Sequence, residues 1–141
     1  MFFDPDNKIV RLCAEGMQLE GKGNFEAAQE LFSQAWEASQ SDLERFIAAH
    51  YVARHQKSAS SKLKWDEESL HYALKIKDER IKTALPSIHL NIGKCYEDLS
   101  DIQRAQEHYQ LAWSYGQQLP NDGYGKMIKA GIRQGLERTF N

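Results

Sequence analysis

A segment of nine residues occurs twice in this chain. AQELFSQAW occupies residues 28–36, and AQEHYQLAW occupies residues 105–113. The copies share five residues and keep an aromatic side chain at the fifth place. Self-similarity at a fixed separation indicates a protein built from repeated supersecondary units, because each unit buries its apolar face against the next one. We therefore expect copies of one unit to determine the architecture.

The match extends beyond the nine-residue segment, always at the separation that links residue 28 to residue 105. Gly16 and Gly93 both stand inside apolar helical patterns. Turn residues follow at 23–24 and 100–101, and each pair precedes a new apolar residue. This order is typical of one helix ending and another beginning. Each unit is therefore predicted to contain two helices joined by a tight turn.

In the second helix of the unit, alanine, an aromatic residue and alanine stand at positions i, i+4 and i+7. Ala28, Phe32 and Ala35 thus share one face of a helix. Glycine within a helix costs about 1 kcal/mol relative to alanine. Gly16 is tolerable if the partner helix passes where a Cβ atom would otherwise lie. The unit is therefore predicted to be a helical hairpin with close internal packing.

This pattern resembles the tetratricopeptide repeat, a helical hairpin of about 34 residues. The resemblance covers about residues 8–118 and departs from the family at Leu12 and His89, where tryptophan is usual. It implies an all-α fold, a right-handed α-solenoid of helix–turn–helix hairpins. The positions that match best belong to the third unit: Ile92, Gly93, Tyr96, Ala105, Tyr109 and Ala112.

The distance between the two matching units leaves room for a middle unit that carries an insertion. Ser41 and Glu44 have the spacing of a capping box, in which two side chains bond free backbone N–H groups at a helix start. We expect the second helix of this unit at residues 65–76, after a polar loop at residues 55–64. The remaining excess is expected around residues 77–85.

The last segment, residues 124–140, alternates apolar and charged residues as an amphipathic helix does. A repeat array exposes an apolar face at its end and needs a polar-backed cap, which this helix is predicted to provide. The whole chain is expected to be a single domain, 1–141. Its predicted parts are repeat 1 at 8–40, a degenerate repeat 2 at 41–82 with the insertion near 55–64, repeat 3 at 85–118 and the capping helix at 122–139.

Composition limits the partners. The net charge of −2 and the isoelectric point of about 6.2 leave no large basic field, which argues against nucleic acid. No run of apolar residues is long enough to predict a membrane span, and the first residues lack the pattern of a signal peptide. Cys13 and Cys95 form no disulfide framework or zinc motif. We expect a cytoplasmic protein with reduced cysteines.

Catalysis has little support in the residue pattern. No two of the five histidines have the spacing that places two imidazoles on one metal ion. The glycine-containing stretch at residues 21–25 lacks the spacing of a phosphate-binding loop and is predicted to be the hairpin turn. Cys13 could act as a nucleophile if folding brought a histidine beside it, but buried cysteine is more commonly a small hydrophobe. We predict no enzyme activity, no metal and no cofactor.

The resemblance implies that partners bind on the concave side, which the first helix of each unit lines. A partly apolar face with asparagine and a few cations suits a peptide or a segment of a partner protein, and the Asn91 amide can both donate and accept hydrogen bonds. The predicted partner-binding residues are Cys13, Met17, Ile47, Tyr51, Arg54, Leu90, Asn91, Lys94, Lys129 and Arg133.

Other functions remain open at this point. Some family members clamp a C-terminal carboxylate with lysine, asparagine and arginine, but the matching positions in this chain include Cys13, Met17 and Ala48, which disfavours a clamp. A regulatory sensor, in which a peptide or ligand shifts the stack between two states, is one alternative. A homo-oligomeric scaffold, in which a second copy fills the groove, is the other.

Overall fold

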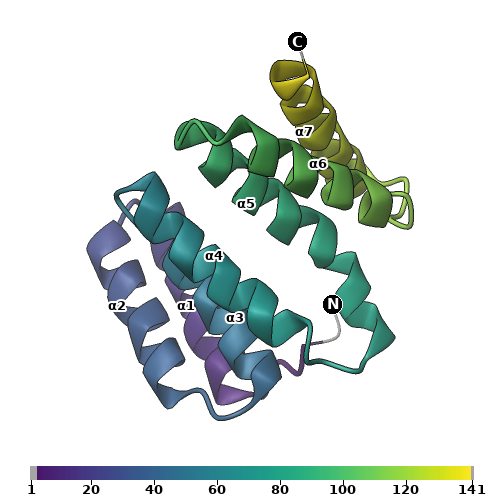
Figure 1. The fold of residues 1–141 in the computed structure, drawn as a ribbon. Coiled ribbons are helices and arrows are strands. Elements are labelled where there is room, and N and C mark those ends of the chain that lie inside the picture. Colours follow the sequence, from purple (N-terminus) through teal and green to yellow (C-terminus); the bar gives the residue numbers. More distant parts are fainter. Residues whose placement is uncertain (1–2, 141) are drawn as a thin grey trace.

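The computed structural model describes residues 3–140, and residues 1–2 and 141 lie outside the described part. Residues 3–140 form seven α-helices, one short 3-10 helix and no strand (Figure 1). The 3-10 helix, η1 (Glu79–Thr83), lies between the fourth and fifth α-helices. The α-helices are α1 (Lys8–Gly21), α2 (Phe25–Ala38), α3 (Asp42–Ala53), α4 (Ala59–Ala73), α5 (Leu85–Asp98), α6 (Ile102–Gly116) and α7 (Gly123–Thr139).

Consecutive helices pack as hairpins. The pairs are α1 with α2, α3 with α4, and α5 with α6, and neighbouring hairpins meet through α2–α3, α1–α3 and α4–α5 contacts. The last helix, α7, packs on both α5 and α6 at the C-terminal end of the array (Figure 1). The all-α solenoid predicted from the sequence is confirmed. No helix within residues 3–140 is both long and apolar enough to cross a bilayer.

The two matching hairpins close as the sequence predicts. A Cβ atom added at Gly16 would lie 2.3 Å from the Cε1 atom of Phe32, and one added at Gly93 would lie 2.8 Å from the ring of Tyr109. Phe32 and Tyr109 are fully buried. The turns also correspond, because Gly23 (φ 80°) and Ser100 (φ 64°) both adopt the left-handed backbone region.

The middle hairpin differs from the prediction at the start of its second helix. The capping box is present, since the Ser41 and Glu44 side chains both bond backbone N–H groups at the start of α3. However, α4 begins at Ala59, so the loop predicted at residues 55–64 is only about half as long. Ser58 accepts a hydrogen bond from the backbone N–H of Ser61 and caps α4. The serine-rich stretch therefore starts a helix instead of extending a loop.

The added length of the middle unit lies mostly after α4. Residues 74–84 connect α4 to α5, and η1 makes up part of this connection. Asp78 begins η1 by accepting a hydrogen bond from the backbone N–H of Arg80. This connection brings Thr83 and Ala84 to the start of α5, opposite α3.

The C-terminal helix is fixed to the preceding hairpin by close contacts. A Cβ atom at Gly135 would lie 2.6 Å from the Tyr109 ring, so α7 approaches α6 closely there. Arg138 pairs with Glu97 at 2.8 Å, and Glu97 also accepts a hydrogen bond from the Tyr109 hydroxyl at 2.7 Å. The amphipathic helix predicted over residues 124–140 is thus present, and packing compensates for its weak intrinsic helix propensity.

Candidate functional site

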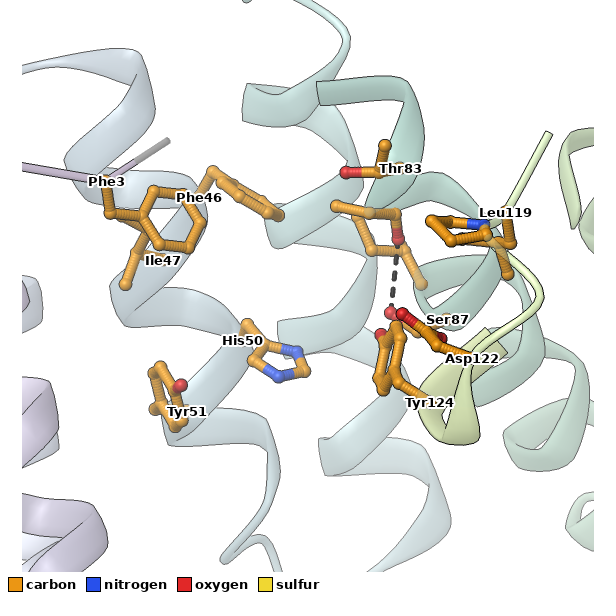
Figure 2. Close-up of a pocket in the computed structure, with 13 residues that line it drawn as sticks. Phe3, Phe46, Ile47, His50, Tyr51, Thr83, Ser87, Leu119, Asp122 and Tyr124 are labelled. Carbon is orange, nitrogen blue, oxygen red and sulfur yellow. Dashed lines mark hydrogen bonds between the residues drawn. The ribbon is translucent and has the colours of Figure 1, made fainter. Parts of the chain in front are cut away.

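A cavity of about 640 Å³ lies between α3 and the start of α5 (Figure 2). The connection between α6 and α7 closes one side of it together with the first turn of α7, as Figure 2 shows for Leu119, Asp122 and Tyr124. We call the thirteen lining residues the α3–α5 groove. They are Phe3, Phe46, Ile47, His50, Tyr51, Thr83, Ala84, Ser87, Ile88, Leu119, Pro120, Asp122 and Tyr124.

One face of α3 forms the first wall. Phe46, Ile47, His50 and Tyr51 recur with helical spacing, so their side chains share a face. Phe46 and Ile47 are almost fully buried, and the Ser69 hydroxyl of α4 donates a 3.0 Å hydrogen bond to the Phe46 carbonyl. Because α4 fixes the back of α3, the wall is part of a packed hairpin.

The start of α5 forms the opposite wall. No side chain caps this helix, and Pro86 stands in its first turn, where a missing N–H group is harmless. The Ser87 hydroxyl donates to the Ala84 carbonyl at 3.1 Å (dashed line in Figure 2). This bond satisfies the hydroxyl within α5, so the wall presents mostly apolar surface, including Ile88.

The two polar side chains that α3 contributes to the groove are uncharged. Burial, together with the positive charges of Arg54 and Lys62, lowers the pKa of His50 to about 4, so its imidazole is neutral at pH 7. Burial also raises the pKa of Tyr51 and keeps its hydroxyl protonated. Within residues 3–140, the ring nitrogens of His50 and the Tyr51 hydroxyl have no hydrogen-bond partner, and they remain open to the groove. Figure 2 shows the His50 ring pointing toward the space between the walls.

Three of the predicted partner-binding residues lie together on α3 and its C-cap. Ile47 and Tyr51 line the groove, and Arg54 follows one turn later. The Arg54 guanidinium lies 5.6 Å from the centre of the Tyr51 ring and pairs with Glu20 at 3.3 Å. Tyr51 also stacks on Phe32, with ring centres 5.2 Å apart. The Tyr51 ring is therefore held in place by contacts with both neighbours.

The two predicted residues on α1 have different positions. Met17 is exposed, with 45% of its surface accessible, but it is not among the groove residues. Cys13 is only 2% exposed and belongs to the core, so it is not available to a partner, which corrects its assignment to the concave face. Burial raises the pKa of Cys13 to about 12, so its thiol is protonated at pH 7 and is not activated as a nucleophile.

The predicted residues of α5 lie beyond the groove. Leu90 packs against α7, where a Cβ atom at Gly131 would lie 3.2 Å from its Cδ2 atom. Leu90 is therefore directed at the capping helix and is half-buried, and its assignment to the partner-binding concave face stays a prediction. Asn91 and Lys94 continue the helix face of Ser87, at i+4 and i+7. Lys94 pairs with Asp98 at 2.6 Å.

The predicted residues of α7 do not line the groove either. Lys129 is half-buried on this helix. The Arg133 guanidinium lies 5.7 Å from the centre of the Trp113 ring of α6. Arg133 therefore contacts the neighbouring helix, and the part of α7 that lines the groove is its first turn, at Tyr124.

The groove includes residues that sequence reasoning missed. His50 stands 34 residues after Gly16, one repeat length on, and so occupies the glycine position of the middle unit, where it borders the cavity. Leu119, Pro120 and Asp122 come from a connection whose return path over α5 has no sequence signal. Phe3 precedes the first predicted helix and had no assigned role. The unusual residue at the glycine position was the one signal that could have identified His50.

The described residues offer no obvious place for a metal ion. Within residues 3–140, no three or more histidine, cysteine, aspartate or glutamate side chains gather closely enough to hold one. Asp122, the carboxylate of the groove, accepts a 2.8 Å hydrogen bond from the backbone N–H of Gly125 and so caps α7.

Comparisons with known proteins bear on the fold. No protein-family model matches the sequence, and no curated protein matches it. Among solved structures, the crystal structure of PcrH from Pseudomonas aeruginosa superimposes with a TM-score of 0.70. The two chains share a fold. The match covers 96% of this chain and 94% of PcrH at 17% identity, and it supports a helical-repeat architecture like that of tetratricopeptide repeats.

Proposed function

We propose that this chain is a non-catalytic, chaperone-type binding module that holds an extended segment of a partner protein in the α3–α5 groove. The observation that carries the proposal is an open, largely apolar cavity into which His50 and Tyr51 present polar atoms that lack partners within residues 3–140. Polar groups that become buried normally find a hydrogen-bond partner. A bound peptide backbone can supply one, because nearly every residue of it carries a donor and an acceptor.

The size of the groove agrees with this proposal. A volume of about 640 Å³ lies in the range of sites that enclose a few side chains. In an extended peptide, alternate side chains point to opposite faces, so one set could enter the groove while the other set stays in solvent. We propose that the flanks of the segment contact Asn91 and Lys94 of α5, Arg54 at the end of α3 and the exposed Met17 of α1.

The charges favour a polypeptide over an anionic ligand. Arg54 and Lys94 are each paired with a carboxylate, at 3.3 Å and 2.6 Å. Among the thirteen lining residues, the charged side chain is Asp122. A carboxylate in an apolar site disfavours phosphates and nucleic acid, whose binding requires a basic surface. Cys13 and Cys95 are free thiols in the described part of the chain, which suits the reducing cytoplasm that we propose as the location.

The test is to fill the groove without changing the helices. Ser87→Trp places a large ring between the walls, whereas Ser114→Trp places the same ring on an exposed position of α6 outside the groove. Tagged forms of both variants and of the unmodified chain are used to capture partners from the native lysate, and partners are quantified by mass spectrometry. We expect at least a tenfold loss of a specific partner with Ser87→Trp alone. A tenfold loss corresponds to about 1.4 kcal/mol, less than the loss of one buried anchor commonly costs.

One further measurement completes this experiment. Circular dichroism of each variant establishes that the helices are intact. If an intact Ser87→Trp variant captures the same partners at the same level as Ser114→Trp, the groove is not the binding site and the proposal fails.

A further inference from the structure

The segment before α1 reaches into the groove. Phe3 is half-buried and is one of the groove residues, and its ring centre lies 6.4 Å from that of Phe46 at a tilt of 50°. Figure 2 shows Phe3 beside Phe46. An aromatic side chain of this chain thus already occupies part of the surface that a partner segment would cover.

The connection between Phe3 and α1 is short and exposed to solvent. Asp4, Pro5 and Asp6 are exposed. The hydrogen bonds at Asp4 are local, from the Asp6 N–H to its carboxylate at 2.9 Å and from the Asn7 N–H to its carbonyl at 3.1 Å. A firm attachment follows at Asn7, whose side-chain amide donates to Glu44 of α3 at 2.8 Å. Three exposed residues therefore separate Phe3 from Asn7, the residue that is anchored at the start of α1.

Phe3 differs in its setting from the apolar groove residues that α3 and α5 contribute. Phe46, Ile47 and Ile88 are each at most 5% exposed and belong to packed helices. Phe3 lies outside every helix and remains partly accessible. A residue outside the helices can leave the groove without unfolding an element, whereas a residue within α3 or α5 cannot.

On the basis of the proposed function, we propose that the Phe3 side chain occupies the groove of its own chain. The partner segment then carries an aromatic side chain that takes the place of Phe3 against Phe46. A tethered group competes at an effective concentration in the millimolar range. The apparent affinity for a partner falls with the fraction of molecules whose groove end is open. A partner segment that spans both walls gains contacts along the rest of the cavity, and so displaces the single side chain of Phe3.

The test uses the full chain and a peptide copied from it. The probe is the acetylated and amidated pentapeptide FDPDN, residues 3–7, and its analogue ADPDN. Each is titrated into the unmodified chain, a Phe3→Ala variant and a Phe25→Ala variant labelled at isoleucine methyl groups. Phe25 is a matched control because it is an exposed phenylalanine outside the groove. Ile47 and Ile88 report on the groove, and Ile102, exposed on α6, reports on unrelated surface.

We expect FDPDN to shift the Ile47 and Ile88 signals and to bind the Phe3→Ala variant several-fold more tightly than the unmodified chain, up to about tenfold. The Phe25→Ala variant should match the unmodified chain, and ADPDN should bind none of them. A Phe3→Leu variant, which keeps an apolar contact with Phe46, should be intermediate.

Other outcomes overturn the inference. If FDPDN bound the Phe3→Ala variant as tightly as the unmodified chain, or more weakly, Phe3 would not compete for the groove. Shifts confined to Ile102, or no binding of FDPDN to Phe3→Ala, would exclude an aromatic anchor at Phe46. None of these results changes the comparison of partner capture between Ser87→Trp and Ser114→Trp. The role of Phe3 can therefore be disproved while the proposed function is still supported. Unaltered capture by Ser87→Trp would instead remove the proposed function.

Discussion

At the scale of single residues, the hairpins depend on the absence of a methyl group. A Cβ atom at Gly16 would lie 2.3 Å from the fully buried Phe32 ring, which cannot move without disturbing the core. We expect Gly16→Ala to lower the free energy of unfolding by about 1–3 kcal/mol, the range for overpacked cores, as measured by urea denaturation. Gly21→Ala is the control, because nothing lies within 4 Å and helix propensity alone should stabilise it by up to about 1 kcal/mol. Equal effects of both substitutions would contradict this account.

The backbone conformation of one residue in the turn of the third hairpin, Ser100, also affects the stability. Ser100 adopts φ 64°, the left-handed region that Gly23 occupies in the matching turn. A side chain in this region costs roughly 1–2 kcal/mol, and glycine avoids that cost. Ser100→Gly should therefore raise the midpoint of thermal unfolding, and Gly23→Ala should lower it. A Ser100→Gly variant that melts below the unmodified chain would show that the serine side chain stabilises the turn.

At the scale of elements, the groove depends on how α7 begins. A Cβ atom at Gly125 would lie 2.0 Å from the Pro120 carbonyl oxygen, so the α6–α7 connection approaches the helix backbone too closely for any side chain. Gly125→Ala should push Pro120 and Tyr124 away and speed hydrogen exchange at residues 119–125 by at least tenfold. Gly123→Ala, with nothing within 4 Å, should leave the exchange unchanged. Equal protection in both variants would mean that the connection adapts without opening the wall.

The helix α7 is predictable from the sequence, but the path of the α6–α7 connection is not. The helix itself was predicted, because apolar residues with helical spacing require only local information. The return of Leu119 and Tyr124 over α5 depends on close contact between Gly125 and Pro120, which has no periodic signal. The contact of Leu90 with α7 has no sequence signal either, and the α5 wall of the groove is formed by Ser87 and Ile88 instead.

At the scale of the whole molecule, repetition explains why the architecture was predictable and the site was not. The repeated positions, such as Gly16 with Phe32 and Gly93 with Tyr109, are the ones that pack inside the hairpins. The candidate surface arises where the units differ, as at His50, which stands at the glycine position of the middle unit and borders the groove. The residues that the units share are packing residues. A repeated pattern therefore predicts the scaffold but not the surface that binds a partner.

The whole molecule should also lose stability as the pH falls below neutrality. Burial is the main cause that lowers the pKa of both His50 and His89 from 6.5 to about 4, with positive neighbours of His50 and with His108 beside His89 as the second causes. Between these values the unfolded chain binds more protons than the folded chain, so the free energy of unfolding decreases as pH falls from about 6.5 toward 4. Each histidine contributes up to about 1.4 kcal/mol per pH unit.

Urea denaturation at several pH values between about 7.5 and 4.5 measures this slope. His89 bonds His108 at 3.0 Å between their Nδ1 atoms inside the α5–α6 hairpin, whereas His71 is exposed on α4. His89→Gln should therefore reduce the pH dependence, because glutamine has no proton to gain in this range, and His71→Gln should leave it unchanged. If the free energy of unfolding of His89→Gln kept the full dependence on pH, proton uptake by other groups would have to account for the loss of stability in acid. Burial of His89 in the α5–α6 hairpin would then not be its cause.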